Sequence, residues 1–146
     1  MQTSNNEGKK VLLRVSNLKQ YFPLKKKGLY VKANDGITLD IYEGETFGLV
    51  GESGCGKSTL GRTILRLHEP TEGQVVYRGK NLAEYGREEM RQMRRELQII
   101  FQDPYSSLNP RMTGRELICA PLDVFAMGSK EEKEARVIEI MDKVVL

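Results

Sequence analysis

One segment of the chain has residue types and spacing that could bind phosphate: Gly51-Glu52-Ser53-Gly54-Cys55-Gly56-Lys57-Ser58-Thr59. It matches the phosphate-binding pattern G-x-x-x-x-G-K-[ST] at every fixed position. Its glycines can adopt backbone angles closed to other residues, so successive backbone N–H groups can turn inward and form a nest for an anion. We therefore expect this segment to bind the phosphates of a nucleoside triphosphate.

The residues around the last glycine supply the charge and the hydroxyl groups that such a site needs. Lys57 is expected to reach the β- and γ-phosphates, and Ser58 is expected to give its hydroxyl to Mg²⁺. Thr59 is expected to lie on the α/β-phosphate side. Cys55 occupies a variable position of the pattern, where a small side chain in a tight loop is a simpler interpretation than a redox role. The predicted nucleotide-binding residues of the loop are Gly51, Ser53, Gly54, Cys55, Gly56, Lys57, Ser58 and Thr59, with Lys57 also catalytic and Ser58 also a metal ligand.

A strand and a helix must flank such a loop. Residues 45–50 are predicted to form a short buried strand that leads into the glycines. A helix is predicted to begin at about Lys57, where its unpaired first N–H groups and its dipole would favour a phosphate. Apolar residues recur at roughly helical spacing along it: Leu60, Ile64, Leu65 and Leu67.

The rest of the chain alternates further strands with tight turns and then becomes helical. Strands are predicted at residues 11–15, 37–41 and 74–77, which indicates an antiparallel sheet beside the strand that carries the loop. Residues 87–96 are predicted to form a charged helix, and residues 97–101 a second buried strand. The prolines and polar residues of segment 102–110 favour a long loop, whose length suggests a function.

The last segment contains a second helix signal. Ser129 and Glu132 form a capping box, and the helix that follows is predicted to bury an apolar stripe. The residues of this predicted stripe are Ala135, Ile138, Met141 and Val145. Because the stripe has no partner later in the sequence, we expect the chain to be part of a larger domain.

Composition excludes several classes of protein. The chain has 146 residues, 39% of them hydrophobic, and lacks the run of roughly 20 apolar residues that a membrane span requires. Its first residues do not resemble a secretory signal, so we expect it in the cytoplasm or on the cytoplasmic side of a membrane. The two cysteines give neither a metal-binding spacing nor a disulfide framework. A net charge of +3 is too small to favour nucleic acid as a partner.

Four segments together resemble the ATP-binding subunits of ABC transporters, most closely those of oligopeptide and dipeptide importers. They are residues 40–46, 48–59, 99–104 and 106–113. The phosphate loop alone does not specify this family. The run Phe101-Gln102-Asp103-Pro104, followed by Ser107-Leu108-Asn109-Pro110, is much more specific.

This resemblance implies roles for residues outside the phosphate loop. Gln102 matches the glutamine of the family's Q-loop, which contacts Mg²⁺ and the attacking water, so Gln102 is a predicted catalytic residue and metal ligand. An aromatic residue ahead of the loop stacks on adenine in the family, and by spacing Phe22 is the best match, with Tyr21 and Tyr30 as alternatives. The implied cofactors are ATP and Mg²⁺. The implied partners are membrane permease subunits, a second ATP-binding subunit and, indirectly, a substrate-binding protein, with the chain peripheral on the cytoplasmic face of the membrane.

The resemblance also predicts an incomplete domain. The family's Leu-Ser-Gly-Gly-Gln signature loop, catalytic glutamate, D-loop and switch histidine are missing from the sequence. We therefore expect an α/β fold, a P-loop NTPase core of the ABC ATPase type with an antiparallel β-subdomain and only the start of the helical subdomain. The predicted divisions are a flexible leader at 1–9, the nucleotide-binding core at 10–102, and the Q-loop with the truncated helical subdomain at 103–146.

Two other functions stay open at this point. In one, Asp103 ends a Walker B-like apolar strand, and the chain is a small P-loop kinase or a GTPase-like switch. In the other, the chain binds nucleotide but does not hydrolyse it, because half of the site is missing. The transported substrate is equally open, since importers of peptides, glutathione and nickel share the quoted loops.

Overall fold

The computed structural model describes residues 8–103 and 107–144 and divides the chain into two compact units between Leu97 and Gln98. Residues 1–7 of the predicted leader, residues 104–106 of the predicted Q-loop segment and Val145 of the predicted stripe lie outside the described residues.

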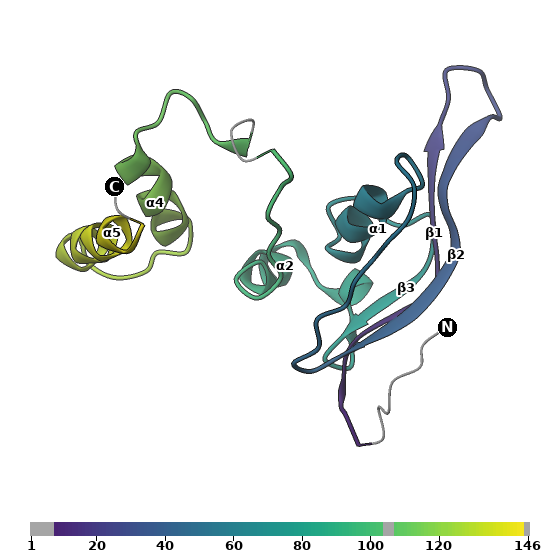
Figure 1. Ribbon diagram of the computed structural model, residues 1–146, viewed down its shortest axis with the longest axis horizontal. Coiled ribbons are helices and arrows are strands. Elements are labelled where there is room, and N and C mark those ends of the chain that lie inside the picture. Colours follow the sequence, from purple (N-terminus) through teal and green to yellow (C-terminus); the bar gives the residue numbers. More distant parts are fainter. Residues whose placement is uncertain (1–7, 104–106, 145–146) are drawn as a thin grey trace. The chain divides into compact units, whose positions relative to one another are not determined.

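The first unit is built on a four-stranded antiparallel sheet of order β2-β1-β3-β4 (Figure 1). The strands are β1 (Val11–Pro23), β2 (Tyr30–Tyr42), β3 (Glu72–Tyr77) and β4 (Lys80–Asn81). The predicted strands at 11–15, 37–41 and 74–77 are confirmed, and each lies within a longer strand. The predicted antiparallel sheet is therefore present.

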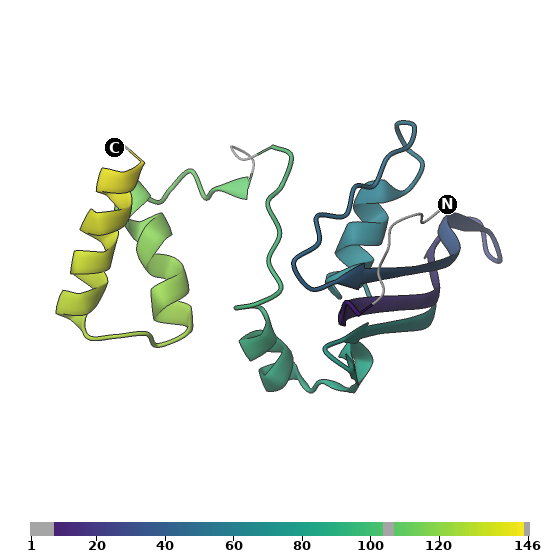
Figure 2. The ribbon, with the colours of Figure 1, turned by 60° about the horizontal axis from the view of Figure 1, so that its bottom comes forward.

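Helix α1 (Lys57–Ile64) covers one face of this sheet (Figure 2). Leu60 of the helix belongs to the same buried cluster as Val15 and Leu18 of β1, both of which are fully buried. Val15 pairs with Leu39 on one neighbouring strand and with Val75 on the other. The core therefore lies between α1 and the middle of the sheet. Burial of these side chains is the main force that holds the helix on the sheet.

Two arginines close the carboxyl end of α1. Arg66 adopts a left-handed conformation with φ 52, which ends the helix, so Leu67 lies beyond the helix on which the sequence had placed it. The Arg66 Nη1 donates to the carbonyl oxygens of Leu82 and Tyr85 at 2.8 and 2.9 Å. Arg94 Nη2 donates to the Arg66 carbonyl at 3.0 Å, and burial together with the nearby Arg66 charge lowers the pKa of Arg94.

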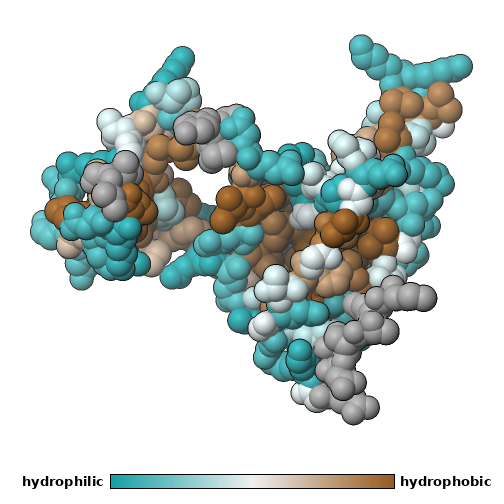
Figure 3. Space-filling model, in the orientation of Figure 1, coloured by the Kyte–Doolittle hydropathy of each residue, from teal (hydrophilic) through white to brown (hydrophobic). Residues whose placement is uncertain are grey.

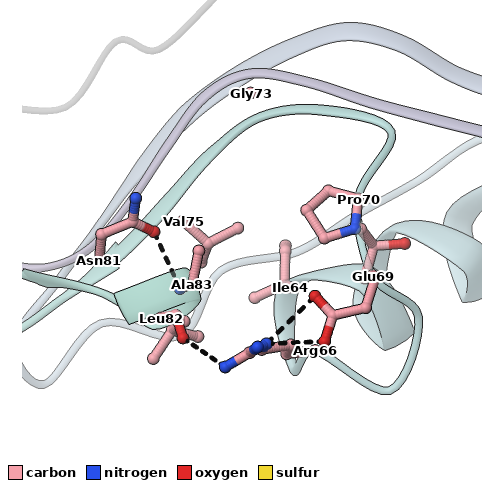
Figure 4. Close-up of a pocket in the computed structure, with 10 residues that line it drawn as sticks. Ile64, Arg66, Glu69, Pro70, Gly73, Val75, Asn81, Leu82 and Ala83 are labelled. Carbon is pink, nitrogen blue, oxygen red and sulfur yellow. Dashed lines mark hydrogen bonds and ion pairs between the residues drawn. The ribbon is translucent and has the colours of Figure 1, made fainter. Parts of the chain in front are cut away.

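The segment after β4 contains the short 3₁₀ helix η1 (Leu82–Glu84) and helix α2 (Arg87–Met93). The two bonds from Arg66 reach Leu82 of η1 and Tyr85, which follows η1. A small pocket, lined mainly by the apolar parts of Ile64, Pro70, Val75 and Leu82, lies beside the Arg66–Glu69 ion pair (Figure 4). The predicted helix at 87–96 is confirmed, although α2 ends at Met93.

The second unit contains a pair of packed helices, α4 (Gly114–Val124) and α5 (Lys130–Lys143). The predicted capping box is confirmed: the Ser129 N–H donates to Glu132 Oε2 at 2.7 Å, and the Glu132 N–H donates to Ser129 Oγ at 3.3 Å. The predicted apolar stripe is largely wrong. Val137 is the buried residue of α5, whereas Ala135 and Ile138 are exposed.

Helix α5 buries a different face from the one predicted, and this face is centred on Val137. Ile140 and Met141 are half-buried and lie three and four residues after Val137, on the same side of the helix. Of the predicted stripe residues that the structure describes, only Met141 lies on this side.

The two predicted buried strands at 45–50 and 97–101 are wrong. Neither segment is a strand, and Val50 and Ile100 are each 95% exposed. A strand needs a neighbour to pair its backbone groups, and no strand in the described part of the chain pairs with either segment. Apolar side chains consequently lie on the surface as well as inside the fold (Figure 3).

The close approach of β3 to β1 yields a stability prediction. Gly73 has φ +90, and a Cβ there would lie 2.4 Å from the Asn17 carbonyl oxygen, whereas Gly79, with φ +84, has open space around it. We expect Gly73→Ala to lower the free energy of unfolding by about 3 kcal/mol, through strain plus the clash. Gly79→Ala should cost about 1 kcal/mol, through strain alone.

Urea denaturation of the two variants checks this expectation, because the pair differs only in the backbone contact. Equal losses of stability in Gly73→Ala and Gly79→Ala would contradict the close packing of β1 on β3.

Candidate phosphate-binding site

The glycine-rich loop leads directly into the first turn of α1. The predicted start of the helix at Lys57 is confirmed, and its N-cap, Gly56, has φ 94. Gly54 also has positive φ, 81. Alternation of ordinary and left-handed residues turns consecutive N–H groups toward one side, the backbone geometry of an anion nest.

The electrostatics of the helix start favour an anion. The N-cap makes no side-chain hydrogen bond, and the first turn of α1 contains no acidic residue. The first intrahelical bond runs from the Leu60 N–H to the Gly56 carbonyl at 2.8 Å. The N–H groups of the first three helical residues, 57–59, therefore have no partner within the helix and lie at the positive end of its dipole.

Lys57 lies across the loop rather than away from it. Its Nζ donates to the carbonyl oxygens of Gly51 and Glu52, both at 2.6 Å, and lies 3.5 Å from Cys55 Sγ. Lys57 forms no ion pair with a carboxylate within residues 8–103 and 107–144. The structure thus places an unneutralised ammonium group beside the nest.

The Cys55 side chain lies close to Gly51, the first glycine of the loop. A Cβ on Gly51 would lie 2.8 Å from Cys55 Sγ. Cys55 is exposed and forms no disulfide. The loop therefore closes on itself at this point, which agrees with a packing role for the small Cys55 side chain.

Strand β2 also contacts the loop, through Ala33 and Asn34, which the sequence analysis did not predict as site residues. A Cβ on Gly56 would lie 2.2 Å from the Ala33 carbonyl oxygen, and Asn34 Nδ2 donates to the Gly56 carbonyl at 3.3 Å. These two residues lie outside the predicted strand at 37–41. The only sequence signal was an asparagine within what proves to be β2, too weak to indicate a role.

Ser58 and Thr59 follow Lys57 in the first turn of α1, and Ser58 is exposed. The residues described contain no group of three or more His, Cys, Asp or Glu side chains that could hold a metal ion. The donors nonetheless fit Mg²⁺, which keeps several waters and takes phosphate oxygens with few protein ligands. A hydroxyl next to a phosphate-binding loop is such a ligand.

Three aromatic residues were predicted as candidates for an adenine platform. Phe22 is half-buried at the end of β1, paired with Val31, and its ring makes an edge contact with His68 at 5.5 Å between centroids. The Tyr21 hydroxyl donates to Asp35, and this bond is the main cause of the lowered pKa of Asp35. Tyr30 is 59% exposed. Phe22 remains the predicted platform, because the Tyr21 side chain is already held by Asp35.

Gln102 belongs to the second unit, whereas the phosphate loop belongs to the first. Its predicted catalytic and metal-binding roles remain predictions. Asp103 follows a segment that is not a strand, and its backbone carbonyl accepts a hydrogen bond from Ser107 Oγ at 2.6 Å. Asp103 is therefore not placed at the end of a Walker B-like strand.

Comparison with known proteins decides the family. The model of the family described as "ABC transporter" matches residues 34–146. The chain belongs to the ABC transporter family. The putative oligopeptide transport ATP-binding protein YkfD of Bacillus subtilis is 55% identical over 128 residues, which are 88% of this chain and 39% of YkfD. The oligopeptide transport ATP-binding protein OppF of Escherichia coli is 47% identical over 148 residues, covering 96% of this chain and 44% of OppF.

A solved ABC transporter structure supports the same fold. The dimeric bacterial ABC transporter cassette MJ0796 superimposes with a TM-score of 0.75 and 29% identity, over 92% of this chain and 57% of that one. The chain thus spans less than half the length of these ABC transporter relatives of known sequence and just over half of the cassette. The predicted fold class, a partial ABC ATPase, is confirmed.

Membership of the ABC transporter family also settles one open alternative. The match includes the phosphate loop and helices α4 and α5 of the second unit, so the chain is not a small P-loop kinase or a GTPase-like switch. No helix in the described ranges is long and apolar enough to span a membrane.

The contact between Gly51 and Cys55 gives a prediction about the geometry of the loop. In Gly51→Ala, the new methyl would press on Cys55 Sγ and open the loop, so the Kd for Mg-ATP should rise about five-fold. Combining it with Cys55→Ala removes the opposing sulfur and should restore the affinity to within about two-fold of Cys55→Ala alone.

Binding of a fluorescent ATP analogue to the four proteins of this cycle checks the coupling. Additive effects of the two substitutions would show that Gly51 and Cys55 are not in contact.

Proposed function

We propose that the protein is the amino-terminal portion of the ATP-binding subunit of an ABC importer, which couples ATP binding and hydrolysis to the uptake of di- or oligopeptides. The relatives YkfD, a putative oligopeptide transport ATP-binding protein, and OppF, an oligopeptide transport ATP-binding protein, support this proposal. A dipeptide transport relative, DppF of Haemophilus influenzae, is 43% identical over 140 residues, 92% of this chain and 42% of DppF.

The observation that carries the proposal is the loop at the start of α1. It combines left-handed Gly54 and Gly56, a helix start without acidic residues, and the ammonium group of Lys57 beside the nest. Each feature attracts negative charge, and together they suit a polyphosphate chain better than a single monovalent anion. The residues that would hold the phosphates of ATP are Gly51, Ser53, Gly54, Cys55, Gly56, Lys57, Ser58 and Thr59. Phe22 would stack on the adenine base.

The chemistry asked of these residues is positioning and charge neutralisation. Phosphoryl transfer to water gains mostly from oriented donors around the transferred group, here the loop N–H groups and Lys57. The flexible stem of Lys57 allows its ammonium group to exchange the carbonyl oxygens of Gly51 and Glu52 for phosphate oxygens. Ser58, with Gln102, would hold Mg²⁺, which when bound neutralises charge on the β- and γ-phosphates.

Further parts of the proposal concern assembly. The partners are permease subunits in the membrane, a second ATP-binding subunit of the same or a related sequence and, indirectly, a substrate-binding protein. The protein would lie peripherally on the cytoplasmic face of the membrane. Within the chain, we assign residues 1–9 to a leader, 10–102 to the nucleotide-binding core and 103–146 to the Q-loop with the start of the helical subdomain.

Substitution of the lysine tests the proposal. Lys57→Ala removes the ammonium group from the nest and should raise the Kd for Mg-ATP by at least about ten-fold, the effect of losing a charge-assisted hydrogen bond. Cys55→Ala removes only a side chain at the rim of the same loop and should change the Kd by less than about two-fold. Isothermal titration with Mg-ATP measures both values.

Equal losses in Lys57→Ala and Cys55→Ala would contradict the role of the lysine. The same preparations also test hydrolysis, because we propose that this chain by itself binds Mg-ATP without steady turnover. Steady phosphate release by the pure chain, abolished in Lys57→Ala, would overturn that part of the proposal.

A further inference from the structure

Buried polar side chains gather between the sheet and α1. Gln20 of β1, Asn34 of β2 and Thr63 of α1 are the buried polar residues of the described chain, with exposures of 5%, 6% and 1%. Gln20 and Asn34 face each other as cross-strand partners, and Thr63 Oγ1 lies 3.4 Å from Gln20 Oε1. Cross-strand partners point to the same face of a sheet, here the face that α1 covers.

Within this group, Asn34 contacts the phosphate loop. Its Nδ2 donates to the carbonyl oxygen of Gly56, the left-handed N-cap of α1, at 3.3 Å. The same carbonyl accepts the first hydrogen bond of the helix, from the Leu60 N–H at 2.8 Å. The orientation of the Gly56 peptide is thereby fixed from two sides, by α1 itself and by β2.

An asparagine at this position has a cost that packing does not explain. Asn34 Oδ1 is buried and has no hydrogen-bond partner among the described protein atoms. A buried amide with one unsatisfied atom is less stable than an apolar side chain of similar shape. What the amide contributes in exchange is the bond to Gly56.

We propose that Asn34 is a positioning residue of the phosphate loop, which holds the Gly56 peptide in the orientation that directs the following N–H groups into the nest. This inference rests on the proposed binding of nucleotide at the loop. Asn34 does not touch the phosphates in this account, and it acts through Gly56.

The test compares Asn34→Leu with Gln20→Leu in the full chain. Asn34→Leu branches at the same carbon but cannot donate, so we expect the Kd for Mg-ATP to rise about five-fold, the effect of one hydrogen bond. Gln20→Leu is a matched control, because Gln20 is equally buried and contacts Thr63 rather than the loop. Its Kd should stay within about two-fold of the unmodified chain.

Amide hydrogen exchange in the absence of nucleotide gives a second measurement, independent of ATP. Asn34→Leu should speed exchange at the amides of the loop and the first turn of α1, while the amides of β1 and β3 keep their protection. Asn34→Ala, which also presents no donor to Gly56, should reproduce both effects if the leucine variant does not fold.

The outcomes separate this inference from the function on which it rests. Unchanged exchange of the loop amides in both Asn34 variants would overturn the inference, as would equal weakening of Mg-ATP binding in Gln20→Leu. Failure of the unmodified chain to bind Mg-ATP would overturn the proposed function, and the exchange measurement would still decide whether Asn34 orders the loop.

Discussion

The close contact between Gly56 and the backbone of β2 is the constraint on which the candidate site depends. Any side chain at Gly56 would collide with the Ala33 carbonyl, since a Cβ there would lie 2.2 Å from that oxygen. The absence of a side chain lets the start of α1 approach the sheet closely, and the positive φ of Gly56 then directs the chain into the helix. Contacts with the antiparallel sheet therefore hold the loop in place. The segment that precedes the loop, residues 45–50, pairs with no strand in the described part of the chain.

The opposite end of α1 is fixed by different chemistry. There the guanidinium groups of Arg66 and Arg94 satisfy carbonyl oxygens at the helix end and in the segment from η1 to Tyr85. Leu60, between the two ends, is buried in the core of the sheet. Because α1 is held at both ends and in the middle, its N–H groups keep a fixed direction, which a preorganised anion site requires.

Local sequence signals predicted the elements whose determinants are local. The glycines and Lys57 indicated the loop and the start of α1, and Ser129 with Glu132 indicated the start of α5, because turns and caps depend on residues a few positions apart. The sequence could not show that residues 45–50 and 97–101 lack pairing, since their apolar composition is that of a strand and pairing depends on distant segments. The buried face of α5 was predicted wrongly for a similar reason. Val137 and Ile138 are both apolar neighbours in the sequence, and which of them is buried depends on how α5 packs against α4.

The contribution of β2 to the site was equally hidden. Asn34 and Gly56 are 22 residues apart, and no local pattern connects them. Phosphate-loop motifs predict the residues that meet the ligand, whereas the residues that hold the loop depend on tertiary packing.

The most direct test of the central claim is the ³¹P NMR spectrum of Mg-ATP titrated with the chain. If the loop at the start of α1 binds the phosphates, the β- and γ-phosphate resonances should shift or broaden in a saturable manner, and Lys57→Ala should remove the effect. Phosphate resonances that stay unchanged while the chain is folded and in excess would contradict the account.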